Sequence, residues 1–150
     1  MEIEKEINQK VFESENQKLH VNILYTASYL SSASTETLKP FGMSWQQFNV
    51  LRILRGLHPG GATIKLLTER MIDKMSNASR LVEKLKQKGY VERQESKTDR
   101  RQVEVKITEL GLDTLKEASS AMTQEFIGFK DRLSDDEMKT LNLLLNRLRG

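Results

Sequence analysis

Residues 63–107 read TIKLLTERMIDKMSNASRLVEKLKQKGYVERQESKTDRRQVEVKI, and this stretch decides the fold. Between residues 65 and 106 there are 12 lysines and arginines against 7 acidic residues, whereas the rest of the chain holds 12 basic and 14 acidic residues. Positive charge gathered in one segment is expected of a surface that meets phosphate. A solvated face without a partner would give the same count, so the charge needs a geometry that could use it.

Two helical patterns come first in this stretch. Thr63 is a candidate N-cap for a short helix that runs to about Met71. A turn at Asp73 or Lys74 leads to a second helix, which runs to about residue 88. Gly89 ends that helix, because glycine adopts positive φ without a steric penalty.

The second helix has two different faces when its residues are placed at 100° intervals. One face is apolar and is expected to be buried: Met75, Ala78, Leu81, Val82 and Leu85. The outward face and its flanks are polar and basic: Ser76, Asn77, Ser79, Arg80, Glu83, Lys84 and Gln87. The pattern therefore predicts a helix anchored in a core that presents hydroxyl, amide and cationic groups to its surroundings.

A basic hairpin is predicted after the second helix. Residues 90–93 read as a short strand. Val103, Val105 and Ile107 alternate with polar residues, which predicts a second strand with one buried face. The polar loop between the two strands, residues 96–101, has hairpin length and contains four charged residues: Lys97, Asp99, Arg100 and Arg101.

Working outward, the flanking segments read as amphipathic helices. Residues 1 to about 38 are predicted to form one long helix, frayed at its start, which Pro40 ends because the residue before proline avoids the helical region. Its apolar stripe is Phe12, Leu19, Ile23, Ala27 and Leu30. Three later helices are predicted from capping residues: one opens with the Ser44–Gln47 capping box and stops near Gly56, one starts at Thr108, and one opens with the capping box of residues 134–137.

Composition excludes several classes of function. A chain of 150 residues without cysteine is expected to form one domain and has no disulfide, thiol catalysis or cysteine-type zinc site. His20 and His58 stand alone, which favours solvated or structural histidines, and no catalytic motif is present, so neither an enzyme, a cofactor nor a metal is expected. No apolar run reaches the roughly 20 residues of a membrane span. The N-terminus lacks the pattern of a signal peptide, so the expected location is cytoplasmic.

Two helices joined by a tight turn and followed by a basic hairpin form a winged helix-turn-helix. The major groove of B-DNA is about 12 Å wide and admits one helix. Arginine can bond guanine through two hydrogen bonds, and asparagine can bond adenine in the same way. A loop with adjacent arginines could reach a neighbouring minor groove, whose negative potential attracts arginine. The stretch is therefore interpreted as a DNA-reading unit, with the helical ends pairing two such units.

Five short motifs carry a resemblance to a known family. They are residues 43–51 (MSWQQFNVL), 79–85 (SRLVEKL), 88–93 (KGYVER), 99–101 (DRR) and 107–111 (ITELG). In order and spacing these motifs resemble those of the MarR family of bacterial transcriptional regulators over about residues 20 to 148. Residues 65–70 depart from the family pattern, since they lack its usual E-L-A core.

The resemblance implies a mainly α (α+β) fold, with a winged helix-turn-helix head over about residues 44–107 and a helical dimerisation region formed by about residues 1–40 and 108–150. It implies a homodimer whose first, fifth and sixth helices interlock. The dimer is expected to bind a palindromic operator in double-stranded DNA as a repressor or activator. A small-molecule effector often releases such a protein from its operator. Arg101 matches the family arginine of the minor groove, and Asp99 matches the acid that orients it. The candidate DNA-binding residues are Ser76, Asn77, Ser79, Arg80, Lys84, Lys97, Asp99, Arg100 and Arg101.

Other interpretations remain open at this point. Taken alone, Arg80 could be an ordinary surface arginine, and Asp99 with two arginines could be a soluble hairpin tip. A winged helix can also serve as a protein-interaction module without DNA binding, because fold does not imply function. Five aromatic residues are expected in the core or the dimer interface, with an effector cavity as the alternative: Tyr25, Tyr29, Phe41, Trp45 and Phe48.

Overall fold

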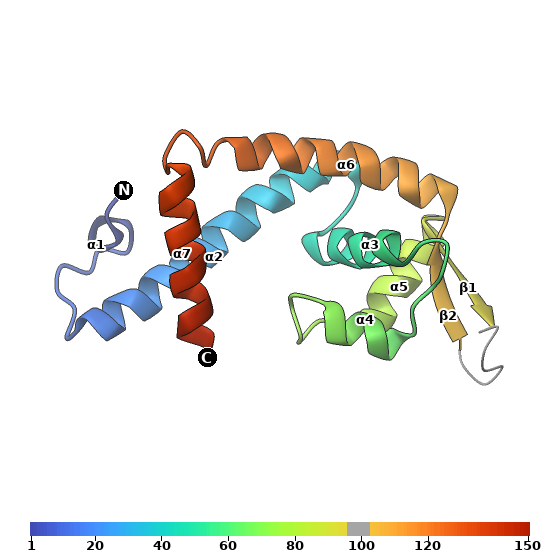
Figure 1. The fold of residues 1–150 in the computed structure, drawn as a ribbon, viewed down its shortest axis with the longest axis horizontal. Coiled ribbons are helices and arrows are strands. Elements are labelled where there is room, and N and C mark those ends of the chain that lie inside the picture. The colour runs from blue at the N-terminus through green and yellow to red at the C-terminus, as the bar shows by residue number, and fades with distance from the viewer. Residues whose placement is uncertain (96–102) are drawn as a thin grey trace.

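The structure, a computed structural model, describes residues 1–95 and 103–150. Figure 1 shows a head at one end, formed by α3, α4, α5, β1 and β2, and the long helices α2 and α6 extending from it. The remaining elements are α1, α7 and the short 3₁₀ helix η1. The bounds are α1 (Ile3–Glu6), α2 (Glu15–Leu38), η1 (Lys39–Phe41), α3 (Trp45–Leu57), α4 (Ile64–Arg70), α5 (Ala78–Gln87), β1 (Val91–Glu95), β2 (Val103–Ile107), α6 (Glu109–Ile127) and α7 (Asp135–Arg149).

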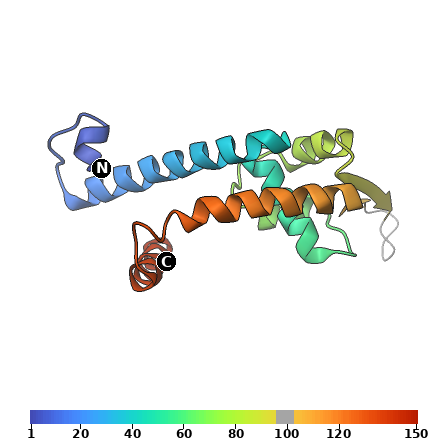
Figure 2. The same ribbon diagram turned by 90° about the horizontal axis from the view of Figure 1, so that it is seen from above.

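The N-terminal segment is not the single long helix that the sequence predicted. Helix α1 ends at Glu6, and α2 begins only at Glu15. The physical reason for the second start is Ser14, whose hydroxyl accepts a hydrogen bond from the Gln17 N–H at 3.2 Å and caps α2. The chain between the two helices reverses direction, so that α1 lies beside the start of α2 (Figure 2).

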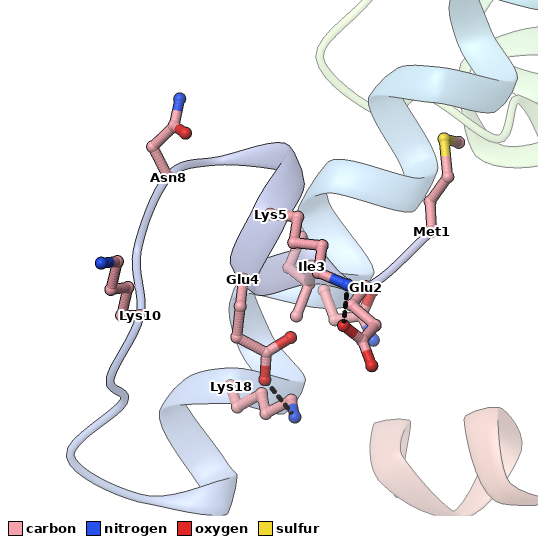
Figure 3. A pocket seen from close by; sticks show the side chains of 9 residues that line it. Met1, Glu2, Ile3, Glu4, Lys5, Asn8, Lys10 and Lys18 are labelled. Atoms are coloured by element: carbon pink, nitrogen blue, oxygen red, sulfur yellow. Dashed lines mark ion pairs between the residues drawn. The ribbon is translucent and has the colours of Figure 1, made fainter.

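Helix α1 is held against α2 by one apolar and two polar contacts. The side chain of Ile3 is buried. Glu4 pairs with Lys18 at 2.5 Å, and Figure 3 shows these two side chains meeting across the helices. The Tyr25 hydroxyl donates a hydrogen bond to Glu6 at 2.7 Å, and this bond raises the pKa of Tyr25. Helix α1 thus occupies part of the outer surface of α2.

Helix α2 ends at Leu38 for a different reason from the one predicted. Lys39, the residue before Pro40, keeps helical dihedral angles, so the proline does not push it out of the helical region. Instead, the chain tightens into η1, in which Pro40 sits near the start. Gly42 follows with a φ of 60°, a left-handed conformation that glycine adopts readily, and turns the chain toward the head.

The core of the head is built around α3. The Ser44–Gln47 capping box is formed in both directions, as the sequence predicted, and the helix ends at Leu57, one residue beyond the predicted end. Its buried apolar side chains pack with those of α4, α5, β2 and α6 into one cluster. The fully buried members of that cluster include Val50, Leu51, Leu54, Leu67, Val82, Leu85, Val105 and Leu115.

Strands β1 and β2 form an antiparallel pair in which Val91 lies opposite Ile107 and Glu95 lies opposite Val103. Ala62 adds an isolated bridge on the other side of β2, with hydrogen bonds of 2.9 and 2.8 Å to Val105. The prediction that Val103 shares the buried face of β2 is wrong, because its side chain is exposed. Val105 and Ile107 are buried beneath the helices, whereas Val103 stands at the far end of the strand.

Helix α6 leaves the head through a tightly bonded joint. The Thr108 hydroxyl caps the helix by accepting from the Gly111 N–H at 3.1 Å, and it also donates to the Gly89 carbonyl at 2.6 Å. A Cβ atom at Gly111 would collide with the Tyr90 carbonyl, so this position needs glycine. From this joint α6 runs back along α2, and the two helices are in contact (Figures 1 and 2).

Helix α7 opens with the predicted capping box of Ser134 and Glu137. The two bonds from the Ser134 N–H and hydroxyl to the Glu137 carboxylate lower the pKa of that carboxyl. The helix contains no buried residue. It faces α2 across an apolar groove of about 770 Å³ that is lined mainly by leucines and isoleucine: Leu19, Ile23, Leu30, Leu141, Leu144, Leu145 and Leu148.

Candidate nucleic-acid interface

Helix α5 has the two faces that the sequence predicted, over a shorter length. Ala78, Val82 and Leu85 are buried against the head. Ser79, Arg80 and Lys84 are exposed on the opposite side. The helix ends at Gln87, and Gly89 follows with a φ of 74°, as expected of a left-handed residue after a helix. An amphipathic helix anchored in this way presents its polar face at a fixed angle.

Three residues predicted to lie on this helix precede it instead: Met75, Ser76 and Asn77. Asn77 is the N-cap, and its side-chain oxygen accepts from the Arg80 N–H at 3.0 Å. Met75 is 93% exposed, so the prediction of a buried side chain is wrong. The 100° periodicity does not hold before a helix begins, and for this reason the face assigned to Met75 was incorrect.

The turn before α5 is organised by Asp73. One carboxylate oxygen accepts from the Ser76 hydroxyl at 2.7 Å, and the other accepts from the Met75 N–H at 3.0 Å. These bonds, the one from the hydroxyl first, lower the pKa of Asp73. An ionised carboxylate can therefore fix the turn that aims the N-terminus of α5. Because the Ser76 hydroxyl already donates to Asp73, its oxygen remains as an acceptor for another group.

The turn is also tied to α3 by Asn49, a residue that the sequence analysis did not single out. The Asn49 side chain is 6% exposed, and its oxygen accepts from the Ile72 N–H at 3.0 Å. The available signal was an amide within the apolar motif of residues 43–51. A buried polar side chain needs a partner, and here that partner is the backbone just ahead of α5.

The other end of α5 is also tied to α3. The Lys88 ammonium donates to the Gly42 carbonyl and to the Gln47 side-chain oxygen, the latter at 3.4 Å. Glu83 was predicted to lie on the outward face, but its carboxylate approaches Arg93 of β1 at 3.5 Å. This half-exposed pair is a weak link, yet it turns Glu83 toward the sheet and leaves the outward face to Ser79, Arg80 and Lys84.

The wing residues of the sequence analysis lie outside the described residues. Lys97, Asp99, Arg100 and Arg101 all fall between Glu95 and Val103, where the two paired strands end. In Figure 1 the turn before α5 and these strand ends lie at opposite sides of the head. The turn before α5 and the ends of the strand pair are therefore separate features of the head.

Metal-ligand clusters, membrane-spanning helices and the aromatic residues bear on other kinds of site in the parts of the chain that the structure describes. Within residues 1–95 and 103–150, no three histidine or acidic side chains come close enough together to hold a metal ion. Over the same ranges, no helix is long and apolar enough to cross a membrane. Of the five aromatic residues considered for an effector cavity, Phe48 is buried in the core of the head, whereas Tyr25 bonds Glu6 at the outer surface.

Comparison with known proteins agrees with this geometry. A sequence model of the MarR family matches residues 41–102. The HTH-type transcriptional regulator MgrA of Staphylococcus aureus is 30% identical over 115 residues, which cover 77% of this chain and 76% of MgrA. Two solved structures share the fold at 23% identity. A MarR-like transcription regulator from Bacillus cereus has a TM-score of 0.79 and covers 90% of this chain and 96% of its own. The organohalide-sensing regulator RdhR, in its 2,4-dichlorophenol-bound form, has a TM-score of 0.81 and covers 91% and 80%.

Proposed function

Since the chain belongs to the MarR family and is a DNA-binding transcription regulator, we propose that it reads a palindromic operator as a homodimer, with α5 in the major groove and the β1–β2 loop in the adjoining minor groove. The observation that carries this proposal is the polarity of α5. Its apolar side chains are buried in the head, and its exposed side holds Ser79, Arg80 and Lys84. A helix with this division can enter a groove about 12 Å wide while its core face keeps it in place.

The exposed residues of α5 suit different parts of the duplex. Arg80, on the first turn, can bond the O6 and N7 atoms of a guanine through two hydrogen bonds. Lys84, one turn later, suits a phosphate oxygen, which fixes the position of the protein without reading sequence. Ser79, Ser76 and Asn77 complete the proposed contact surface at the N-terminal end of the helix.

The wing is assigned to the minor groove on the basis of sequence alone. Arg101 is proposed to enter the groove, with Asp99 orienting it and with Arg100 and Lys97 adding positive charge. Support comes from the antiparallel pairing of β1 and β2, whose ends at Glu95 and Val103 lie well apart from the turn before α5 (Figure 1). One head could then contact two neighbouring grooves.

A second copy of the chain is proposed to fill the groove between α2 and α7. Three leucines on one side of the amphipathic helix α7 are about half exposed and line the groove: Leu141, Leu144 and Leu148. Pairing through residues 1–40 and 108–150 would bury them and place two heads about 34–36 Å apart, the separation of half-sites one helical turn from each other. Each mismatched base pair costs only about 1–3 kcal/mol, so two heads reading twice as many positions discriminate better than one.

Regulation completes the proposal. The chain is proposed to act in the cytoplasm as a repressor that a small molecule releases from DNA. Support for the small molecule comes from RdhR, which shares the fold and whose structure holds 2,4-dichlorophenol.

The test is selection of bound duplexes from a random pool, followed by binding measurements on the selected sequence. We expect a palindromic consensus with half-sites one helical turn apart. Arg101→Ala should weaken binding more than tenfold while the protein stays dimeric. Arg80→Ala should reduce discrimination between the operator and a scrambled duplex; equal loss on both would make Arg80 a phosphate contact. Absence of duplex binding at low salt would refute the proposal and favour a protein-interaction module.

A further inference from the structure

Two apolar side chains are exposed on the turn that precedes α5. Ile72 is 64% exposed and Met75 is 93% exposed. The other residues between Met71 and Ala78 are polar or charged, namely Asp73, Lys74, Ser76 and Asn77. An exposed apolar residue is common on protein surfaces and needs no explanation alone. Two of them on a short polar turn form an apolar spot beside the proposed recognition helix.

The backbone of both residues is fixed by side-chain hydrogen bonds. The Ile72 N–H donates to Asn49, whose buried side chain belongs to α3. The Met75 N–H donates to Asp73, which also accepts from the Ser76 hydroxyl. Because the turn is tied both to the core and to itself, the two apolar side chains leave the head from defined positions. Methionine in addition has an unbranched and polarisable side chain that adapts to the surface it meets.

The location of the turn decides what the two side chains can meet. In helix-turn-helix proteins the N-terminal residues of the recognition helix contact base edges in the major groove. Met75 stands three residues before Ala78, the first residue of α5, and two residues before Asn77, its N-cap. The turn thus continues the proposed DNA-contacting surface formed by Ser79 and Arg80 at the same end of the helix.

In the major groove, the C5-methyl group of thymine is the apolar group that base pairs present, and apolar side chains recognise thymine through it. Ser79 and Arg80 offer mainly hydrogen-bonding groups to the base edges, whereas Ile72 and Met75 offer apolar ones. We propose that Met75, assisted by Ile72 three residues earlier, determines specificity for thymine by contacting its C5-methyl group. This inference rests on the proposed function, because it requires α5 to lie in the major groove.

The test combines a change in the protein with a change in the DNA. Starting from the duplex that the protein selects from a random pool, each thymine is replaced singly by uracil, which pairs identically but lacks the methyl group. For at least one position in each half-site, we expect the wild-type protein to bind the uracil duplex about fourfold more weakly, the effect expected for one methyl group removed from an apolar contact. Met75→Ala should bind the thymine and uracil duplexes equally at that position.

Coupling between the two changes separates a direct contact from an effect of the methyl group on DNA shape. If uracil weakens the wild type and Met75→Ala to the same extent, or weakens neither, the inference is overturned. Because Met75 is almost fully exposed, its replacement should leave the melting temperature unchanged, and that measurement accompanies each variant. Failure of the wild-type protein to bind any duplex would instead refute the proposed function.

Two further variants sharpen the result. Met75→Leu keeps an apolar side chain and should retain the preference for thymine, whereas Met75→Gln keeps the length of the chain and should lose it. Val11→Ala provides the matched control, since Val11 is also highly exposed but lies between α1 and α2, outside the head. Because residues 1–40 belong to the proposed dimer region, the dimer dissociation constant of this variant is measured in parallel. The control should show the wild-type ratio of thymine to uracil affinity. A loss of that ratio in Val11→Ala, or its retention in Met75→Gln, would contradict a specific role for Met75.

Discussion

Leu51 in α3 and Leu144 in α7 are both leucines on amphipathic helices, yet the Leu51 side chain is 0% exposed and the Leu144 side chain is 50% exposed. The difference extends to whole regions. The head closes a core within one chain, in which side chains from α3, α4, α5, β2 and α6 bury one another. Helix α7 buries none of its residues and borders an apolar groove. The first region is complete in one chain, whereas the second leaves apolar side chains exposed along the groove that is proposed to receive a second copy.

The comparison also distinguishes two uses of amphipathic pattern. In α5 the apolar side covers the core, and the exposed polar side is available for contact with DNA. In α7 no residue is buried, and the leucines that line the groove with α2 stay about half exposed. Apolar periodicity therefore predicts that a helix will bury one face, but not whether that face is buried within its own chain.

Substitution of Leu51 by alanine should have the largest effect. Leu51 is fully buried, and its truncation removes buried methyl groups and leaves a cavity, which typically costs about 2–5 kcal/mol of unfolding free energy. Denaturant unfolding monitored by circular dichroism would measure the loss. We expect a similar loss at every protein concentration, because the contacts of Leu51 lie within one chain. A cost below about 1 kcal/mol would show that the head does not depend on this core.

The same substitution at Leu144 tests the other region. Alanine is the best helix former, so Leu144→Ala should leave α7 helical and the head folded. In a dimer it should remove apolar contacts from both copies, at a cost of about 2–4 kcal/mol in association free energy. Sedimentation equilibrium would give the change in the dimer dissociation constant. An unchanged constant would remove α7 from the proposed interface, even if the protein is dimeric.

Much of the fold could be predicted because it depends on local signals. The starts of α3, α4, α6 and α7 follow from Ser44, Thr63, Thr108 and Ser134, each of which caps its helix as expected. Ser14 and Gln17 also carry the pattern of a capping box, which marks the start of α2. The apolar stripe that continues back to Phe12 favoured one uninterrupted helix instead. The candidate contact residues on α5 followed from its periodicity.

The remaining differences arise from tertiary context. Val103 alternates correctly with its neighbours, but the strand extends beyond the helices that could bury it. The link from Asn49 to the Ile72 N–H joins residues 23 apart in sequence, and no local pattern identifies such a partner. Met75 was placed on the wrong face because the helix starts three residues later than predicted. Each of these errors concerns where an element meets the rest of the molecule.

Loss of one buried hydrogen bond within the head should cost less free energy than truncation of either leucine. Asn49→Leu removes the acceptor of the Ile72 N–H in a buried place, and an unsatisfied buried donor costs about 1–3 kcal/mol. We expect a corresponding loss of unfolding free energy and faster amide hydrogen exchange at Ile72. Asn16→Leu, at an exposed position in the first turn of α2, is the matched control and should change neither. Unaltered exchange at Ile72 in Asn49→Leu would contradict the link.

The smallest effect is expected at Asp73, and it should depend on pH. Hydrogen bonds from the Ser76 hydroxyl and the Met75 N–H lower the pKa of this carboxyl in the folded protein, so the ionised form stabilises the folded state. That contribution is complete above the ordinary aspartate pKa of about 3.9 and is lost as the pH falls through the lowered folded value.

Asp73→Asn should therefore melt at a lower temperature than the wild type near neutral pH, and the difference should disappear in acid. Asp131→Asn, at an exposed position between α6 and α7, serves as the control and should show no such convergence. If the melting temperatures of Asp73→Asn and the wild type differ by the same amount at every pH, the carboxylate does not hold the turn through its charge. The positions of Met75 and α5 would then depend on Asn49 and the core of the head alone.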